Sequence, residues 1–324
     1  MGIVRRLNCF DKHKIKEMIS YLGTKDDLSE EIMSETFTML QSCFPLKYKF
    51  LPESFILLEE KEIQGMITII PTYGNPYKIC ITRLIFKQNN YDAGKQLIEF
   101  IAAKYGAKGA ISFNVLIDES NDELYDLFVI GCGFRQCSTE SLWKLKSIKP
   151  AALNQKLFRR CQKNDTKAVA LLFNNEIISL YHPSLDRIKE EYQEPFFAGF
   201  YKCSKCRYVA ENPQNNEITA YLSITTEDNF NFIIDILHNN GYEISYRDII
   251  NFALNEITRR KTVFYAFVKQ KRYTKTSDKL EEYLKSVNAD LIQTQRVLVK
   301  DFYRQIKQDK PVLQVNNGMV WLNR

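Results

Sequence analysis

The stretch RLIFKQNNYDAGKQLIEFIAAKYG, residues 83–106, joins an apolar run to an amphipathic one. The apolar run stops at Phe86, and a polar turn that contains Gly94 follows it. After the turn, apolar residues recur at helical spacing, namely Leu97, Ile98, Ile101, Ala102 and Tyr105. The pattern predicts a strand, a turn and a helix, which is one arrangement in which proteins hold a phosphate group on backbone amides.

The chain contains an internal repeat with a period near 154 residues. Four pairs of segments match in the same order: 3–15 with 157–169, 62–70 with 217–225, 83–106 with 236–259, and 133–143 with 288–298. In the first pair, IVRRLNCFDKHKI and LFRRCQKNDTKAV share an Arg-Arg pair followed by an aspartate. Because this period is the size of a domain, we predict two copies of one fold, over residues 1–150 and 151–324.

Each copy is expected to have the element order β-α-α-β-β-β-α-β-α-β. In the first copy, strands are predicted over 2–7, 54–60, 62–70, 77–86, 109–116 and 137–145, and helices over 11–22, 28–44, 92–105 and 120–130. An α/β fold follows, with a mixed, mostly antiparallel sheet covered by helices on both faces. The strand at 111–116 should run parallel to the strand at 79–86, because a helix connects them.

The composition and the apolar runs argue against a membrane-spanning or a secreted protein. The 324 residues are 45% hydrophobic and carry a net charge of +6, which permits an anionic partner but demands none. No apolar run approaches the ~18 residues that cross a bilayer, and the first residues do not form a secretory signal. The eight cysteines lie mostly in apolar periodic segments, which fits a reducing compartment. We expect a cytoplasmic protein without a membrane partner.

The order of elements and three stretches resemble the GCN5-related N-acetyltransferase (GNAT) superfamily, in its tandem-domain form. The stretches are EKEIQGMITI (60–69), LIFKQNNYDAGKQLI (84–98) and NDELYDLFVIGCGF (121–134), which ends in a Gly-Phe pair. The resemblance implies two acetyltransferase-like domains and acetyl-CoA, or another acyl-CoA, as co-substrate without a metal. It implies transfer of the acyl group to an amine of a small molecule or peptide.

The family's cofactor loop reads Arg/Gln-x-x-Gly-x-Gly/Ala, and the resemblance places Asn89, Asp92 and Gly94 at its signature positions. Only the last glycine is kept. Amides at the helix start would hold the pyrophosphate and Lys95 would add positive charge, whereas the Asp92 carboxylate repels phosphate. Alternatively, Asp92 is a helix N-cap and the turn holds no ligand. The expected cofactor-binding residues are Leu84, Ile85, Phe86, Asn89, Asn90, Tyr91, Asp92, Ala93, Gly94, Lys95 and Asn121.

The second copy departs further from the family's loop. Its segment HNNGYEISYRDII (238–250) has no glycine at a signature position, and Arg247 stands in place of Gly94. A bulky side chain there would keep a cofactor from the backbone. The first copy is therefore the expected cofactor-binding domain, and the second is expected to have a degenerate loop.

The family's acid, a tyrosine four residues before the Gly-Phe pair, corresponds to Val129 here. Tyr125 lies one turn earlier and is the candidate catalytic residue, with a packed aromatic as the alternative interpretation. For Asn121 the alternative is a helix N-cap. Two functions stay open: an N-acyltransferase, or a catalytically degenerate module that binds CoA, another ligand or a partner protein.

Two further motifs bear on metal and nucleic-acid binding. Cys203 and Cys206 form a lone CxxC, which lacks the other ligands of a zinc site. The basic stretch 258–279 has interleaved aromatic residues, as in some RNA-binding segments. We favour a strand with Val263, Tyr265 and Phe267 on one face, flanked by solvated charges. We therefore expect no nucleic-acid partner and leave a homodimer open.

Overall fold

The computed structural model describes residues 2–20, 52–87, 90–146, 158–193, 204–242 and 245–302. It also describes two short strands further along the chain, β13 (Val315–Asn316) and β14 (Met319–Val320). The predicted helix over 28–44 and the proposed boundary near residue 150 lie outside the described residues. Within the described part of the chain, no helix has the length and apolar character needed to span a bilayer.

The first half contains every other predicted element, within a few residues of its expected bounds. The elements are β1 (Ile3–Arg6), η1 (Cys9–Asp11), α1 (Lys12–Ser20), β2 (Glu53–Glu59), β3 (Glu62–Thr72), β4 (Asn75–Phe86), α4 (Tyr91–Gly106), β5 (Ser112–Asp118), α5 (Asp122–Asp126), the π-helical η2 (Leu127–Gly131) and β6 (Arg135–Lys144). As predicted, β4 and β5 are parallel.

The second half repeats this order. Its elements are β7 (Arg159–Arg160), η3 (Lys163–Asp165), α6 (Thr166–Glu176), η4 (Ser179–Tyr181), α7 (His182–Leu185), η5 (Lys189–Tyr192), β8 (Ser204–Glu211), β9 (Ile218–Thr226), β10 (Asn231–His238), α8 (Tyr246–Thr258), β11 (Tyr265–Lys271), α9 (Ser277–Ser286) and β12 (Asp290–Asp301). Strands β10 and β11 are parallel, as β4 and β5 are in the first half.

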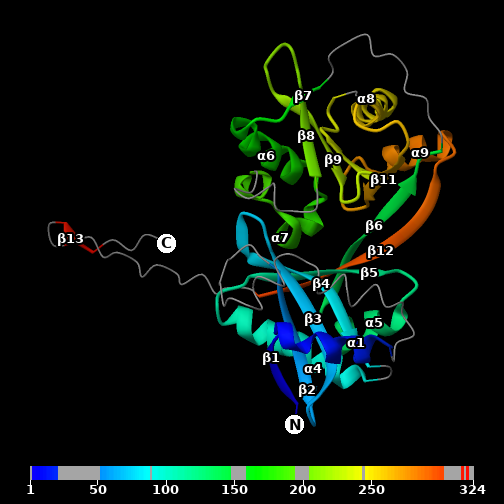
Figure 1. Cartoon of the computed structure of the whole chain (residues 1–324). Helices are drawn as coiled ribbons and strands as arrows, with labels where there is room; N and C mark the ends of the chain where they lie inside the picture. The colour runs from blue at the N-terminus through cyan, green and yellow to red at the C-terminus, as the bar shows by residue number, and fades with distance from the viewer. Residues whose placement is uncertain are drawn as a thin grey trace.

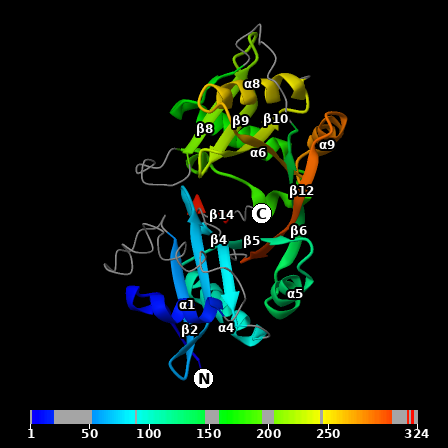
Figure 2. The same ribbon diagram turned by 45° about the vertical axis from the view of Figure 1, so that its right-hand side comes forward.

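All twelve of these strands form one sheet in the order β1-β2-β3-β4-β5-β12-β6-β11-β10-β9-β8-β7. Apart from β4–β5 and β10–β11, neighbouring strands in it are antiparallel. The last strand of the first half, β6, lies beside β11 of the second half, and β12 lies beside β5 (Figures 1 and 2). We call this arrangement the strand exchange. Each half thereby receives its closing strand from the other.

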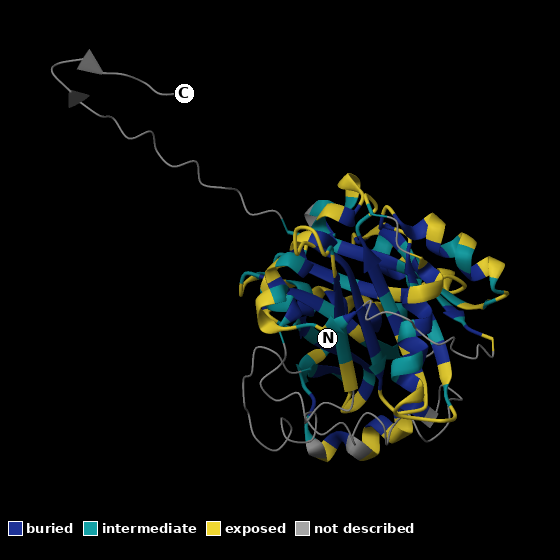
Figure 3. Ribbon diagram, turned by 90° about the horizontal axis from the view of Figure 1, so that it is seen from above, coloured by how far each residue is buried: buried dark blue, intermediate teal, exposed yellow. Residues whose placement is uncertain are grey.

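Helices cover the sheet in both halves, and the buried residues lie between the helices and the strands (Figure 3). In the first half, α4 packs over one face and α1 over the other. In the second half, α8 and α9 pack over one face and α6 over the other. The fold is therefore the predicted α/β class, with a mixed, mostly antiparallel sheet.

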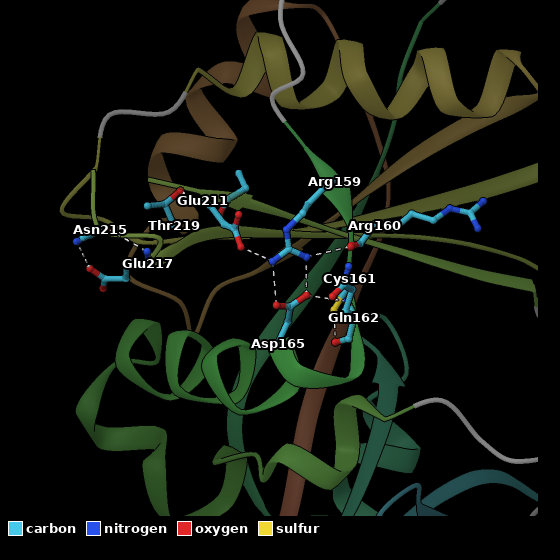
Figure 4. Close-up of polar contacts among 10 residues, drawn as sticks. Arg159, Arg160, Cys161, Gln162, Asp165, Glu211, Asn215, Glu217 and Thr219 are labelled. Carbon is cyan, nitrogen blue, oxygen red and sulfur yellow. Dashed lines mark hydrogen bonds and ion pairs between the residues drawn. The ribbon is translucent and has the colours of Figure 1, made fainter. Parts of the chain in front are cut away.

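The Arg-Arg and aspartate motif of the repeat makes the same contacts in both copies. The Arg5 guanidinium donates to the two carboxylate oxygens of Asp11 at 2.8 and 2.6 Å, and Arg159 donates to those of Asp165 at 2.7 and 2.9 Å (Figure 4). Each guanidinium also donates to the carbonyl of the next residue at 3.1 Å. Each carboxylate accepts a backbone amide from three residues earlier. The sequence repeat is thus confirmed at the level of individual hydrogen bonds.

We predict that Asp165→Asn lowers the free energy of unfolding by about 1–3 kcal/mol at pH 7, because it breaks a charge-assisted pair. The hydrogen bond from Arg159 holds the pKa of Asp165 below its usual value. A lowered folded-state pKa stabilises the fold above the unfolded pKa of about 3.9, and this contribution is lost as the pH falls through the folded pKa. Denaturant unfolding from pH 7 to pH 3 should show the difference from wild type shrinking below about pH 4.

The control is Asp126→Asn at an exposed position in α5, which should change the unfolding free energy by less than about 0.5 kcal/mol. A difference between wild type and Asp165→Asn that stays constant over this pH range would contradict the assignment.

Candidate functional site

Strands β4 and β5 diverge at their carboxyl ends. They pair only from Lys78 to Ile81, opposite Ser112 to Val115. Beyond this point β4 runs on to Phe86, paired with β3, while β5 runs on to Asp118, paired with β12. Within the described part of the chain, the end of β4 therefore has a partner strand on one side only. We call this region the β4–β5 divergence.

The backbone of β4 offers donors toward the divergence. The Lys87 amide donates to the Gln64 carbonyl of β3 at 2.9 Å. Since successive residues of a strand direct their N–H groups to opposite sides, Phe86 and Leu84 direct theirs away from β3. The Ile85 amide faces β3, so Leu84 and Phe86 are the candidate donors of the predicted stretch.

The start of α4 is capped by Asn90. Its side-chain oxygen accepts the Ala93 amide at 3.2 Å, and its own amide donates to the Lys87 carbonyl at 3.0 Å. The alternative interpretation of Asp92 as the N-cap is therefore wrong, and Asp92 lies exposed in the first turn. The amides of Tyr91 and Asp92 make no hydrogen bond to another described residue. Asn89, the first signature position, lies outside the described residues.

Gly94 is buried, and packing explains why a glycine stands there. A Cβ atom at this position would lie 3.0 Å from the Phe86 ring and 3.0 Å from Leu127 Cδ2. The glycine therefore lets α4 approach β4 and η2 closely. Ala93 is only 1% exposed, so its side chain belongs to the core. The amides of Ala93 and Gly94 both donate to Asn90, so neither residue has an unbonded amide at the helix start.

Charged and aromatic side chains flank the two unbonded amides. Lys95 is exposed, and its ammonium lies 3.9 Å from the Glu99 carboxylate. The Tyr91 ring packs edge-on against Phe86 at 5.5 Å, and its hydroxyl donates to the Glu123 carboxylate of α5. This hydrogen bond raises the pKa of Tyr91. The first turns of α4 and α5 are thereby joined.

Helix α5 carries the remaining predicted residues. Asn121 is its N-cap, because the side-chain oxygen accepts the Leu124 amide at 3.0 Å. Tyr125 is partly buried against the α4-side core. The Arg296 guanidinium from β12 lies 4.5 Å from the centre of the Tyr125 ring and forms an ion pair with Asp122 at 2.9 Å. The strand exchange therefore places a residue of the second half against the candidate acid.

The Gly-Phe pair of the resemblance follows directly after η2. Gly133 has a φ of +70°, a left-handed conformation that favours glycine. Phe134 is buried, with its ring 5.0 Å from that of Phe128. The pair thus ends the helix and returns the chain to the core.

In the second half, β10 and β11 also stop pairing, after Asp235 and Lys269. Ser245 caps α8 as Asn90 caps α4, through the amide of the third residue along. Because the two caps are equivalent, Ile249 occupies in α8 the position that Gly94 occupies in α4. The predicted alignment of Arg247 with Gly94 is therefore wrong by two residues. Ile249 is fully buried in the core.

Side chains of the second half fill its own divergence. The His238 ring nitrogen Nε2 lies 2.7 Å from the Tyr246 hydroxyl, which donates to the Thr276 carbonyl at 3.1 Å. The fully buried Gln270 side chain accepts from the Trp143 indole at 2.9 Å and donates to Ser277. These bonds join β10, α8, β11 and α9. The amides of Tyr246 and Arg247 at the start of α8 make no hydrogen bond to another described residue, as with Tyr91 and Asp92.

The basic stretch contains the predicted strand, β11, with Tyr265 and Phe267 on one face, but Val263 precedes the strand and this face is the less buried one. Val263 and Tyr265 are exposed, whereas the buried residues of β11 include Ala266, Val268 and Gln270. Nor are the charges all solvated. Lys271 is buried and binds both carboxylate oxygens of Asp235, and Lys269 forms an ion pair with Glu140 of β6. The sequence could not reveal these partners, because both acids come from neighbouring strands.

No protein-family model matches the chain, and no curated protein matches it by sequence. Solved structures do match. A tandem GNAT protein from the clavulanic acid biosynthesis pathway is 7% identical, with a TM-score of 0.58 over 93% of this chain and 98% of that one. A GCN5-related N-acetyltransferase from Sphaerobacter thermophilus is 11% identical, with a TM-score of 0.58 over 93% and 95%. A putative acetyltransferase from Pyrococcus horikoshii is 11% identical, with a TM-score of 0.51 over 93% and 90%.

The chain therefore has the fold of tandem GCN5-related N-acetyltransferases, as the sequence predicted. At these identities the likeness concerns the fold, and the site has to be argued from the residues of this chain.

Proposed function

We propose that the protein transfers an acetyl or other acyl group from acyl-CoA to an amine of a small molecule or peptide. The observation that carries this proposal is the β4–β5 divergence, which lies at the start of α4 and has unbonded backbone amides on both elements. The proposed division is an N-terminal cofactor-binding domain, 1–150, and a C-terminal domain, 151–324, whose closing strands are exchanged.

The helix start would hold the pyrophosphate of the cofactor. The amides of Tyr91 and Asp92 point out of the first turn, where the helix dipole favours an anion. Lys95 adds positive charge, and Asn89 is proposed to contribute from the preceding loop. The carboxylate of Asp92 opposes the binding of phosphate. The side-chain NH2 group of Asn121 is proposed to contact the pantetheine arm.

Acyl transfer from a thioester to an amine requires few protein groups. The amine must be neutral to attack the thioester carbonyl, which gains negative charge as the new C–N bond forms. The amides of Leu84 and Phe86 are proposed to donate to that oxygen. The C–S bond then breaks, and the thiolate takes a proton. Tyr125 is the candidate donor of that proton.

Two observations favour a second function. At the divergence of the second half, the His238, Tyr246 and Gln270 side chains hydrogen-bond across β10, α8, β11 and α9, and we infer that this half holds no cofactor. Tyr125 also packs under Arg296, as a structural aromatic would. A module that binds CoA, or another ligand, without turnover fits these features.

We predict that acetyl-CoA raises the melting temperature by mass action and that two substitutions change its affinity in opposite directions. Asp92→Asn should tighten binding about two- to fivefold, since it removes a negative charge from a helix start. Lys95→Glu should weaken binding by at least a similar factor. Thermal shift against acetyl-CoA concentration measures both. The matched control is Lys261→Glu, which makes the same charge change at an exposed position just after α8. Equal affinities in all four proteins would contradict the placement of the pyrophosphate.

We also predict that Tyr125→Phe lowers kcat about 100-fold or more while leaving the KM for acetyl-CoA unchanged. The ring and its contact with Arg296 are kept, so the melting temperature should stay the same. Release of free CoA thiol with a panel of primary amines measures turnover. Wild-type turnover in the variant would exclude Tyr125 as the acid. Acetyl-CoA binding without thiol release in either protein would support the second function.

A further inference from the structure

A pocket of about 320 Å³ lies in the second half, beside the Arg159–Asp165 pair. It is lined by Cys161, Gln162, Lys163, Thr166, Tyr192, Gln193 and Arg207. These residues come from the turn after β7, the start of α6, the end of η5 and β8. Figure 4 shows this turn, with Cys161 and Gln162 between β7 and Asp165. The pocket lies on the α6 side of the sheet and is separate from the first half's β4–β5 divergence.

The pocket has a net positive lining. Lys163 and Arg207 are its two cationic residues, and no acidic residue is among the described residues that line it. Asp165 belongs to the same turn, but its carboxylate is bound by Arg159 and by the Gln162 amide. The first turn of α6, which begins at Thr166, adds the positive end of a helix dipole.

Two ion pairs lie in the strands beside Arg207, and Arg207 belongs to neither. Arg207 lies in a row of paired positions that crosses the sheet through Ser223 and Asp235 to Lys269. Asp235 binds Lys271, and Lys269 binds Glu140. No carboxylate of the described residues forms an ion pair with Arg207.

Arg207, which lines the pocket, and Tyr221, which packs against the lining residue Tyr192, each have a buried polar atom without a hydrogen bond to a described residue. Arg207 Nε is buried without a hydrogen bond to a described residue, while Nη1 donates to the Tyr192 carbonyl. The Tyr221 side chain is 5% exposed, and its hydroxyl is likewise unpartnered. Its ring packs edge-on against Tyr192 at 5.6 Å. Buried donors are nearly always satisfied in native proteins, so two of them beside one cationic cavity point to a ligand.

We propose that this pocket binds a small molecule through a carboxylate or phosphate group. Arg207 supplies a guanidinium, whose planar fork suits either group, and Lys163 supplies a second positive charge. The Tyr221 hydroxyl is the third group assigned to this ligand, because its ring packs against Tyr192, which lines the pocket. This site is independent of acyl transfer, because none of its residues belongs to the proposed cofactor site.

Thermal shift with inorganic phosphate and with succinate, each at constant ionic strength against chloride, tests the proposal. A saturable rise in melting temperature with phosphate identifies a phosphate ligand, and one with succinate identifies a carboxylate ligand. Tyr221→Phe should weaken that binding about tenfold, through the loss of one hydrogen bond to a charged group. Without ligand, it should not lower the melting temperature, because the hydroxyl it removes has no partner.

Arg207→Gln should abolish the shift. The matched control is Arg160→Gln, which makes the same charge change on the adjacent strand. Arg160 is exposed, and its side chain points away from the Arg159–Asp165 contact (Figure 4). The control should keep wild-type binding. The proposal is overturned if neither anion produces a saturable shift. It is also overturned if the shift is the same in wild type, Tyr221→Phe and Arg207→Gln.

Discussion

The strand exchange is the constraint on which the rest of the molecule depends. In the centre of the sheet, β12 pairs with β5 on one side and with β6 on the other, and β6 pairs in turn with β11. Neither half has a complete sheet without a strand from the other. Side chains on the exchanged strands also make contacts between the halves. Glu140 of β6 forms an ion pair with Lys269 of the second half, and Arg296 of β12 packs on the Tyr125 ring of the first. The two copies are therefore coupled by backbone hydrogen bonds as well as by buried charge.

The two halves share one arrangement of strands and helix but differ in the side chains around it. Both halves contain a parallel strand pair that diverges beside a capped helix, through Asn90 in one and Ser245 in the other. In both halves the first two amides of that helix make no hydrogen bond to another described residue, which suits an anion. In the second, the histidine, tyrosine and glutamine side chains of β10, α8 and β11 close the same place with hydrogen bonds. On the α6 side of the second half, Arg207 and Lys163 line a separate pocket without an acidic residue among its described lining.

Local sequence patterns predicted the local structure well. Alternation and helical spacing located the strands and helices, and the repeated Arg-Arg and aspartate motif gave the same ion pair twice. The N-cap was missed, because asparagine and aspartate cap equally well and the packing of Gly94 on Phe86 decides where α4 begins. The strand exchange was missed because β6 and β12 satisfy the same hydrophobic pattern in either sheet. No pattern could mark Arg207 or Tyr221, since each is distinguished by one buried atom, Nε or the hydroxyl, that has no hydrogen bond to a described residue.

The strand exchange can be tested by a disulfide between β5 and β12. Asp118 and Gln295 face each other, and the Glu119 amide donates to the Thr294 carbonyl at 2.9 Å. The two residues are therefore a non-hydrogen-bonded pair, whose Cα atoms lie close enough for a disulfide. With Asp118→Cys and Gln295→Cys in one chain, mild oxidation of the monomer followed by peptide mapping should give a 118–295 cross-link. A folded monomer in which residue 118 is cross-linked to β6, or in which no 118–295 link forms, would contradict the exchange.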